Sequence, residues 1–460
     1  MKLLDRQGVL TRGLATIREQ FQVPQEFPAD VIAAAEQAKS RRSSPRADWT
    51  ATPFVTLDPA ASTDLDQAFA LASDGSDIIL HYAIADVGNF VTAGDPIDVE
   101  AWKRGTTIYL PDGKASLYPR VLSEGAASLL PDGDRPAVVF TVRIDSSGEV
   151  RLDGAERSIV RSRAKLAYET VTSADLPPEF LELHRRIQSA ENARGAERVD
   201  APEQEVAPDG PGNYVLRFRP QLESELQNAS LSLAANLAIA DTMLAHRTGL
   251  FRVMAKPEEW AVGRLRHTAK ALGLVWPKDA TLGQFERTLE TGNPTHAAFR
   301  SAVRRASPST GYEPYKEGVV PWHSAMAATY AHATAPLRRL ADRTVIEIAL
   351  QLAAGQAVGP DLTAACERLP KVMARAENRA SQIDRAVLDL AEAVMLQGCE
   401  GTGFKAVVTD IDDRGTRIQL TDPAIVARID GKKALPGDTI DVVLDAADIA
   451  NRQVKFRRVG

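Results

Sequence analysis

The spacing of apolar residues changes twice along the chain, and this restricts the fold more than any other feature. From Phe54 to Val142, short apolar runs separated by turn residues follow the pattern of strands. Between about 220 and 400, apolar residues recur at helical spacing, notably over 231–244, 344–352 and 362–396. The C-terminal part returns to five β-rich segments separated by turns. The sequence therefore predicts an α+β protein with more than one domain.

The N-terminal part has a pattern of its own. Apolar residues recur at helical spacing from Leu10 to Phe21 and from Val31 to Ala38, and a stretch rich in Ser, Arg and Pro follows. We expect a helical extension at 1–49, with a helix-turn-helix as one arrangement of it. A large mixed domain is expected at 50–397, and a five-stranded barrel of the oligonucleotide-binding (OB) kind at 398–460.

Composition sets the cellular context. The two cysteines, Cys366 and Cys399, cannot build a disulfide framework, which favours a reducing compartment. The sequence shows neither a signal-peptide pattern nor an apolar run of about 20 residues, so we expect a cytoplasmic protein without membrane contact. Nothing indicates an obligate protein partner, and we expect a monomer. The net charge of −6 argues only weakly against nucleic acid, because binding depends on where basic residues cluster.

Three carboxylates crowd the end of one predicted strand and the loop after it. Asp58, Asp64 and Asp66 fall within nine residues of one another. Their mutual repulsion is costly unless a cation compensates it, and carboxylate oxygens suit Mg²⁺ or Mn²⁺. We therefore predict a metal site formed by these three residues. The alternative, an acidic solvated loop, has equal weight on spacing alone because Asp-rich turns are common.

A second segment, Thr334–Asp342, combines a helix start with two arginines. Pro336 would precede the helix, Thr334 would cap it, and Arg338 and Arg339 would lie in its first turns. A helix N-terminus beside guanidinium groups is a phosphate site. Taken alone, an ordinary capped helix with surface arginines is the better interpretation.

The two segments together supply the parts of a nuclease. Metal-held carboxylates and a phosphate-gripping arginine are what in-line attack on a phosphodiester needs. The sequence contains no Walker-type phosphate loop, no Gly-x-Ser-x-Gly elbow and no zinc spacing. These absences exclude kinase, esterase and zinc-enzyme interpretations.

With these motifs, the chain resembles the ribonuclease II and ribonuclease R family of exoribonucleases. The resemblance covers 46–396 and rests on several motifs in the same order: 46–50, 54–58, 84–87, 104–111 and 334–342. It implies a catalytic domain of the RNB type that degrades single-stranded RNA processively from the 3′ end, using Mg²⁺ or Mn²⁺, to 5′-nucleoside monophosphates. It also implies that the C-terminal barrel is an RNA-binding domain of the ribosomal S-one type.

The resemblance also assigns roles to single residues. Asp58, Asp64 and Asp66 match three of the family's four catalytic aspartates, and Asp66 matches the most critical one. Arg338 matches the arginine that stabilises the scissile phosphate. Tyr109 matches an aromatic residue that packs on the 3′-terminal nucleotide. Tyr168 resembles a tyrosine near the RNA path, with a plain core tyrosine as an equal alternative.

Two departures from the family pattern matter for function. The fourth aspartate is Gln67 here, a neutral residue that still offers a carbonyl oxygen. The main alternative function is therefore a weak or inactive RNA-binding adaptor on the same scaffold, and a metal-dependent endonuclease or DNase is a second rival. We expect Gln67→Asp to lower the metal concentration needed for activity, because a fourth carboxylate would add charge facing the cation.

The second departure is at the N-terminus. The family usually carries two OB-type cold-shock barrels before the catalytic motifs, whereas the residues before Asp58 are too few for them and have helical periodicity. We expect these helices to build the RNA entrance instead, with Arg12, Arg18, Arg41 and Arg42 touching phosphates. A packing extension that never meets RNA is the alternative of equal weight.

Overall fold

The computed structural model describes residues 2–4, 8–41, 46–131, 133–196, 203–210, 213–219, 222–290, 293–412, 415–431 and 434–459. Its centre is a closed five-stranded barrel in which β2 and β8 pair in parallel and the other neighbours pair antiparallel. Phe54, Phe69, Tyr82 and Phe140 are fully buried among these strands. The barrel strands are β2 (Ala47–Asp58), β3 (Gln67–Asp74), β4 (Asp77–Ala85), β7 (Arg135–Ile144) and β8 (Val150–Ala167).

Helices cover this barrel and share one hydrophobic core with it. Helix α5 contacts β4, β7 and β8, and α9 contacts β8. The 23-residue α5 is apolar on most of its faces, as expected for a buried helix. The helices of this region are α2 (Ala29–Ala38), α3 (Pro96–Arg104), α4 (Phe180–Arg194), α5 (Glu223–Ala245) and α9 (Leu340–Ala353).

Short elements complete this region. They are the hairpin β5 (Ile108–Leu110) and β6 (Gly113–Ala115), the pair β11 (Leu250–Met254) and β12 (Thr310–Pro314), and the single turns η1 (Val87–Asn89), η2 (Leu122–Ala126) and η3 (Ser173–Asp175).

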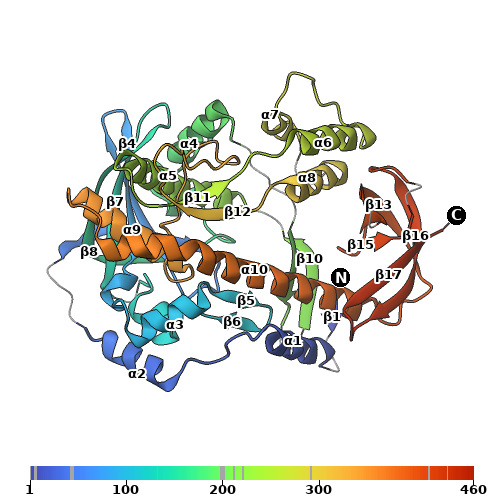
Figure 1. The fold of residues 1–460 in the computed structure, drawn as a ribbon, viewed down its shortest axis with the longest axis horizontal. Coiled ribbons are helices and arrows are strands. Elements are labelled where there is room, and N and C mark those ends of the chain that lie inside the picture. The colour runs from blue at the N-terminus through green and yellow to red at the C-terminus, as the bar shows by residue number, and fades with distance from the viewer. Residues whose placement is uncertain are drawn as a thin grey trace.

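A small helical insert has a core of its own. It comprises α6 (Glu259–Ala271), α7 (Leu282–Glu286) and α8 (Pro294–Ala306). Trp276 stacks on Phe285 with a centroid distance of 4.9 Å, and Phe299 meets both rings edge-on. Because these rings pack on one another, the insert forms a separate cluster between the central barrel and the C-terminal sheet (Figure 1).

One long helix joins the two halves of the molecule. Helix α10 (Pro360–Leu396) runs from beside α9 to the C-terminal strands (Figure 1). Its first half, including Leu369 and Met373, belongs to the core of the central barrel. Its second half, including Ile383 and Leu390, belongs to a second core shared with the C-terminal sheet. The helix thereby fixes the position of one region relative to the other.

The C-terminal strands form a five-stranded antiparallel sheet in the order β15-β14-β13-β16-β17. The edge strands β15 and β17 contact one another, so the sheet nearly closes into a barrel. The predicted α+β fold with a C-terminal five-stranded barrel is confirmed. Its strands are β13 (Gly403–Asp412), β14 (Gly415–Leu420), β15 (Val426–Ile429), β16 (Thr439–Asp448) and β17 (Gln453–Arg458).

The N-terminal segment departs from a helix-turn-helix. Helix α1 (Val9–Gln20) buries Leu10 and Leu14 in the core shared with α10 and the C-terminal sheet, whereas α2 buries Val31 and Ala35 in the core of the central barrel. The two helices therefore pack into different clusters and do not form one compact unit. A strand precedes them: β1 (Lys2–Leu4) pairs with β10 (Asn213–Arg219), which pairs with β9 (Glu203–Pro208). Helical periodicity could not reveal a strand of three residues such as Lys2–Leu4, whose partner strand begins at Asn213.

Among the described residues, no helix is long and apolar enough to span a membrane.

Candidate active site

The aspartate segment lies at one end of the central barrel, between two of its strands. Asp58 is the last residue of β2, Gln67 is the first of β3, and Asp64 and Asp66 lie in the loop between them. Lys165 donates to the carbonyl oxygens of Ala60 and Ser62, at 2.7 and 2.6 Å. The loop is therefore held by a cation from β8, and its acidic residues have a fixed position.

A second set of contacts holds the loop from the opposite side. The Ser128 hydroxyl accepts from the backbone N–H of Leu65 at 2.9 Å and donates to the carbonyl of Thr63 at 2.7 Å. The N–H of Leu129 donates to the carbonyl of Leu65 at 3.0 Å. Such a fully bonded loop needs no regular secondary structure to stay in place.

Asp66 is the most buried of the three aspartates and receives two donors from the arginine segment. Its carboxylate accepts from the N–H of Leu337 at 2.7 Å, and Arg338 Nε lies 3.4 Å from the other oxygen. Burial raises the pKa of Asp66 to about 7, against the opposing effects of Arg338 and the Leu337 N–H. The two segments that the sequence singled out, 271 residues apart, therefore meet at this carboxylate.

Asp58 is part of the same environment. Burial raises its pKa to about 6, with Arg338 and Lys165 acting in the opposite direction and Asp64 adding to the rise. Burial disfavours the charged form of a carboxylate, so both groups favour a cation nearby.

Asp64 has different partners from the other two aspartates. Lys114 Nζ lies 2.7 Å from its carboxylate and also 3.2 Å from Glu124. The Tyr109 hydroxyl donates to the second oxygen of Asp64 at 3.4 Å. Lys114 and Glu124 were missed from the sequence, because no local pattern indicates that a β-hairpin lysine reaches this loop.

These contacts bear on the predicted metal site. Three carboxylates offer the hard oxygen donors that a divalent cation prefers; Asp66 is buried and Asp58 is partly buried. Within the described ranges, however, no three His, Cys, Asp or Glu side chains stand close enough together to form a metal cluster. The chemistry of the donor set fits a divalent cation, while the Lys114 ammonium neutralises Asp64.

Gln67 does not behave as a fourth metal-facing residue. Its side-chain N–H₂ donates to the carbonyl of Thr334 at 2.7 Å, and its side-chain oxygen accepts from Tyr82 and, at 3.2 Å, from Ser232. The amide is thus used fully in joining β3 to β4, α5 and the arginine segment. The expectation that Gln67→Asp lowers the metal requirement assumed a side chain facing the cation, and these contacts oppose it. An aspartate would place a carboxylate against the Thr334 carbonyl instead.

The arginine segment differs from its predicted form. Helix α9 starts at Leu340, with Arg339 as its N-cap residue, and Thr334 does not cap it. Asp342 is the reason: its fully buried carboxylate accepts from the Ala335 N–H at 2.7 Å and from both Nε and Nη2 of Arg339. The polypeptide before the helix is therefore held as a loop by a side chain from the first turn.

The two arginines consequently have different uses. Arg339 is engaged through a two-point ion pair with Asp342, which raises its pKa despite burial, and this contact gives it a structural role beside the substrate-binding role predicted for it. Arg338 keeps about half of its side chain exposed, at 47%. Its backbone carbonyl accepts from the Thr107 N–H and the Thr106 hydroxyl, at 3.0 and 2.8 Å. The free end of Arg338 can therefore reach a ligand while its backbone stays fixed.

Gly105 makes this anchoring possible. It adopts a φ of +73°, and an added Cβ would lie 2.7 Å from Ala376 of α10. Its carbonyl accepts from the Leu340 N–H at 3.0 Å. A left-handed backbone in close contact with a helix requires glycine, which explains this residue within the 104–111 motif.

The two tyrosines predicted to bind substrate lie beside the aspartates. Tyr109 points outward from β5 with half of its surface exposed, and burial of its hydroxyl together with Asp64 raises its pKa. The Tyr168 hydroxyl accepts from Asn228 at 2.8 Å, and its backbone N–H donates to the Asp58 carbonyl at 3.2 Å. Tyr168 is partly buried against the core, so its contacts are compatible with both predicted roles.

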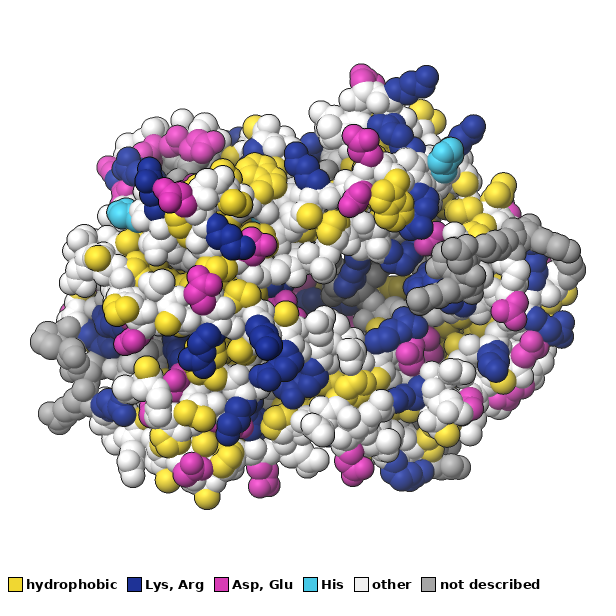
Figure 2. Space-filling model, viewed as in Figure 1, with side chains coloured by type: hydrophobic (Ala, Val, Ile, Leu, Met, Phe, Trp, Pro, Cys, Tyr) yellow, Lys and Arg dark blue, Asp and Glu magenta, His cyan; other side chains and the backbone are white. Residues whose placement is uncertain are grey.

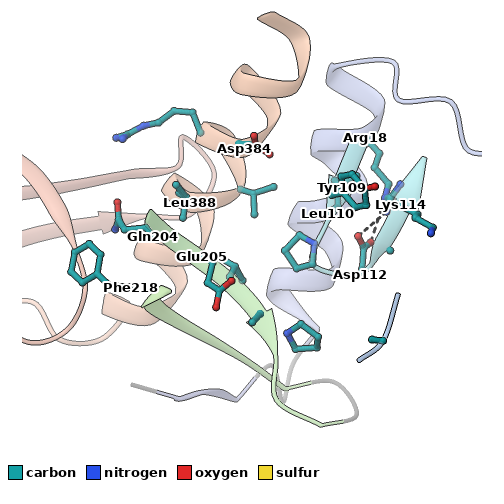
Figure 3. Close-up of a pocket in the computed structure, with 18 of the residues that line it drawn as sticks. Arg18, Tyr109, Leu110, Asp112, Lys114, Gln204, Glu205, Phe218, Asp384 and Leu388 are labelled. Carbon is teal, nitrogen blue, oxygen red and sulfur yellow. Dashed lines mark hydrogen bonds and ion pairs between the residues drawn. The ribbon is translucent and has the colours of Figure 1, made fainter. Parts of the chain in front are cut away.

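A cavity of about 1380 Å³ opens from the aspartate loop toward the C-terminal sheet. Tyr109 and Lys114 lie on one wall of it, and Asp384, Leu388 and Phe218 lie on the other (Figure 3). The cavity continues to residues of the C-terminal sheet such as Gln419.

The N-terminal helix contributes to this wall, although its arginines are engaged. Arg18 reaches the cavity and forms a two-point contact with Asp112 (Figure 3). Arg41 donates to Thr92 at 3.0 Å, on a different side, and Arg42 lies outside the described residues. Of the four arginines expected at the entrance, Arg18 is the one that the described structure places on the cavity.

Comparison with known proteins agrees with this arrangement. The RNB domain model matches residues 46–353, and the model of the RNase II-type exonuclease C-terminal S1 domain matches 403–459. The chain is 26% identical to ribonuclease R of Aquifex aeolicus, over 89% of this chain and 61% of the relative. It is 25% identical to ribonuclease R of Escherichia coli, over 94% and 60%. The chain thus spans about 60% of the length of these relatives.

Solved structures share the fold. The structure of Mycoplasma genitalium RNase R in complex with ribose methylated single-stranded RNA has a TM-score of 0.87 at 19% identity, over 98% of this chain and 78% of that one. A yeast pseudonuclease has a TM-score of 0.66 at 16% identity, over 94% and 58%. The family resemblance inferred from separate motifs is therefore confirmed. Because the domain model spans well over half of its length, the chain belongs to the RNB domain family of ribonuclease II and ribonuclease R.

Proposed function

We propose that this chain is an Mg²⁺-dependent exoribonuclease that degrades single-stranded RNA processively from its 3′ end to 5′-nucleoside monophosphates. One observation carries the proposal: the buried carboxylate of Asp66 meets Arg338 and the Leu337 N–H, and the same loop opens at Asp64 into a cavity that also exposes Tyr109. A carboxylate, a guanidinium and an aromatic face are the groups that a 3′-terminal phosphodiester would require. Family membership supports the same reaction.

The residues divide the work as follows. Asp58, Asp64 and Asp66 would hold the divalent cation, with Mn²⁺ as a possible substitute for Mg²⁺. Bound there, the cation would supply an activated water at neutral pH and neutralise charge on the phosphoryl oxygens. Arg338 would bind the scissile phosphate through its guanidinium fork. Tyr109 would stack on the last base, and this contact tolerates any base because every base has a π-face.

The proposed organisation follows from these contacts. The segment 50–397 would act as the catalytic domain and 398–460 as an RNA-binding domain. Of the helices within 1–49, α2 packs on the first and α1 on the core shared with the second. Phe404 and Phe456 of the C-terminal domain meet edge-on at 5.9 Å, and Phe456 is buried. These contacts favour a core role for the two rings over base stacking. We propose a cytoplasmic monomer.

The test uses 5′-labelled single-stranded RNA with Mg²⁺, Mn²⁺ or a chelator. Processive cleavage from the 3′ end predicts that full-length RNA converts to a short labelled end product with few intermediates, and that the chelator stops the reaction. Immediate release of a labelled mononucleotide would indicate the opposite direction. Defined internal fragments, or equal cleavage of DNA, would support the endonuclease or DNase alternative.

A non-cleaving RNA-binding protein remains the second candidate, because Lys114 neutralises Asp64 and Gln67 serves as a structural amide. Tight binding of the labelled RNA with no cleavage under any metal condition would establish this candidate and overturn the first.

A further inference from the structure

Arginines gather at the end of the cavity that is lined by the helical insert, α10 and the C-terminal sheet. We call this the distal end. Arg304 and Arg305 of α8, Arg385 of α10 and Arg417 of β14 all line it. Lys and Arg side chains lie on both sides of the hollow between the helical insert and the C-terminal sheet (Figure 2). A protein with a net charge of −6 therefore concentrates positive charge on one internal surface. We call these four residues, together with Arg428 of β15, the arginine cluster.

Two members of the cluster stand directly opposite one another in the sheet. Arg417 of β14 and Arg428 of β15 are cross-strand partners. Like charges in such positions destabilise a sheet, because the side chains emerge on the same face about 5 Å apart. On its other side, Arg417 stands opposite Asp410 of β13, which offsets part of this repulsion.

The pKa of Arg417 reflects this repulsion together with burial of the side chain. Burial, followed by repulsion from Arg305, Arg428 and Arg385, lowers the pKa of Arg417 to about 10, with Asp410 opposing. The pKa of Arg305 is also lowered, by burial and by the neighbouring arginines Arg264 and Arg428, against the effect of Asp410. Burial is the largest cause of both shifts and the neighbouring arginines add to it, so the cluster holds positive charge out of water.

Nearby carboxylates compensate the cluster only in part. Asp410 lies 3.5 Å from Arg305, and Asp389 lies 2.7 Å from Arg385. Among the described residues, Arg417 Nε has no hydrogen-bond partner although it is buried. The positive charge at Arg417 is therefore directed to a cavity and lacks an ion pair of its own among the salt bridges of the described residues.

The cluster is formed where the helical insert docks on the C-terminal sheet. Arg305 Nη2 donates to the carbonyl of Thr409 at 3.2 Å, which ties α8 to β13. Gly437 lies under α6, and an added Cβ there would be 2.8 Å from the carbonyl oxygen of Ala271. These contacts fix arginines from the insert, the sheet and α10 around one hollow.

We propose that the arginine cluster binds phosphodiester groups of the substrate strand several nucleotides upstream of its 3′ end. This inference rests on the proposed function, because it uses the cavity that begins at Tyr109 and the aspartate loop. A strand whose last base stacks on Tyr109 would extend through the same cavity and bring its backbone past Arg417 and Arg304. Guanidinium groups bind phosphates through paired N–H donors, and such contacts are independent of base sequence.

RNA fits the cluster better than an acidic protein segment does. The arginines share one continuous cavity with Tyr109, a base-stacking residue, and the cavity has carboxylates at its other end. An acidic peptide has no base to stack on Tyr109, whereas an RNA strand would place its phosphates on the arginines and its last base on that ring.

The experiment measures RNA binding by fluorescence anisotropy in an Asp66→Asn background, so that the probe is not degraded. The probes are a strand of about twenty nucleotides and one of about three, since only the longer one would extend to the cluster. Arg417→Met should weaken binding of the long strand several-fold and should reduce the slope of log Kd against log salt by about 0.7–1. The effect on the short strand should be much smaller.

Two further variants make the result decisive. Arg417→Lys keeps the charge and should retain most of the salt slope, which separates charge loss from misfolding. Arg151→Met removes an exposed arginine of β8 outside the cavity and should leave both measurements unchanged. Equal weakening of both strands by Arg417→Met, or no weakening of the long one, would overturn the proposal.

A polyglutamate peptide tests the other ligand class. It should bind far more weakly than the long strand, and binding of equal strength that Arg417→Met abolishes would assign the cluster to an acidic protein partner instead. This result is independent of catalysis. If the parent protein binds long RNA through Arg417 but does not cleave it, the RNA-binding role of the arginine cluster is supported and the nuclease proposal fails.

Discussion

The two ends of the cavity hold charges of opposite sign away from water, and at both ends burial shifts the pKa values toward the neutral form. At the catalytic end, burial raises the pKa of Asp58 to about 6 and of Asp66 to about 7. At the distal end, burial and neighbouring arginines lower the pKa of Arg417 to about 10. Each end gathers like charge out of water, at a cost to stability, and each therefore favours a partner of opposite sign.

The comparison shows that the net charge of the whole chain does not indicate whether a local surface can bind RNA. The excess of acidic residues argues against RNA binding, yet the arginines of the cluster are concentrated at one end of the cavity. An RNA strand with a cation at its 3′ end would match both ends at once. The predictions that follow test each end separately.

The largest effect is expected for Asp66→Asn. Asparagine keeps the acceptor for the Leu337 N–H but loses the charge that faces a cation, so cleavage should fall by about 10³-fold or more while RNA binding persists. Because the buried charge disappears, the variant should also melt at a higher temperature than the parent in the absence of metal. Asp74→Asn, an exposed change on β3, serves as the control. Robust cleavage by the Asp66 variant would remove Asp66 from the catalytic set.

Arg338→Lys should follow, with a loss of about 10²-fold in the rate constant for cleavage, because lysine keeps the charge without the planar fork. Its melting temperature should stay near that of the parent, since the side chain is half exposed. Arg339→Lys is the matched contrast: it breaks the two-point contact with the buried Asp342 and should lower the melting temperature instead. If the two variants exchange these phenotypes, the division of roles between the arginines is wrong.

Lys114→Met tests whether the catalytic end carries a built-in competitor of the metal. Removal of the ammonium frees Asp64, and an ion pair of about 1 kcal/mol corresponds to roughly fivefold tighter binding of Mn²⁺. Electron paramagnetic resonance of free Mn²⁺ measures this directly, without an activity assay. Lys103→Met, a change at an exposed position, should have no effect. Unchanged Mn²⁺ binding by the Lys114 variant would show that Lys114 does not compete with the metal, and weaker binding would show that Lys114 supports the site.

The last effect bears on stability and not on catalysis or metal binding, and it concerns a third buried charge, near the distal end. Glu392 of α10 accepts from Gln204 and from the Val426 N–H, and burial raises its pKa from 4.5 to about 7. The folded protein therefore binds more protons than the unfolded chain between these values, so stability falls as the pH rises through that window.

Glu392→Gln should remove this loss. The stability of the variant should match that of the parent near pH 4.5 and exceed it by about 1–3 kcal/mol at pH 8, as measured by denaturant titration. Glu313→Gln, at a half-exposed position, should show no such trend. A difference between Glu392→Gln and the parent that is the same at both pH values would mean that Glu392 does not titrate in this range.

The sequence by itself determined the elements and the aspartate segment. Strand and helix periodicity depend on neighbouring residues, so the strands around Phe54 and Val138 and the long helix up to Leu396 could be predicted. Asp58, Asp64 and Asp66 lie within nine residues, at a strand end and in the loop after it, and the motifs of the family mark Arg338. These features depend on residues that are close in sequence, so the spacing of neighbouring residues is enough to predict them.

Only the tertiary structure decided which of these residues act together. Asp342 holds the preceding loop open and so separates the uses of Arg338 and Arg339, although both read as the first turn of a helix. Lys114 reaches Asp64 from a hairpin 50 residues away, and the arginine cluster joins α8, α10 and the C-terminal sheet. Contacts between residues so far apart depend on how the elements pack, and no pattern of neighbouring residues records that packing.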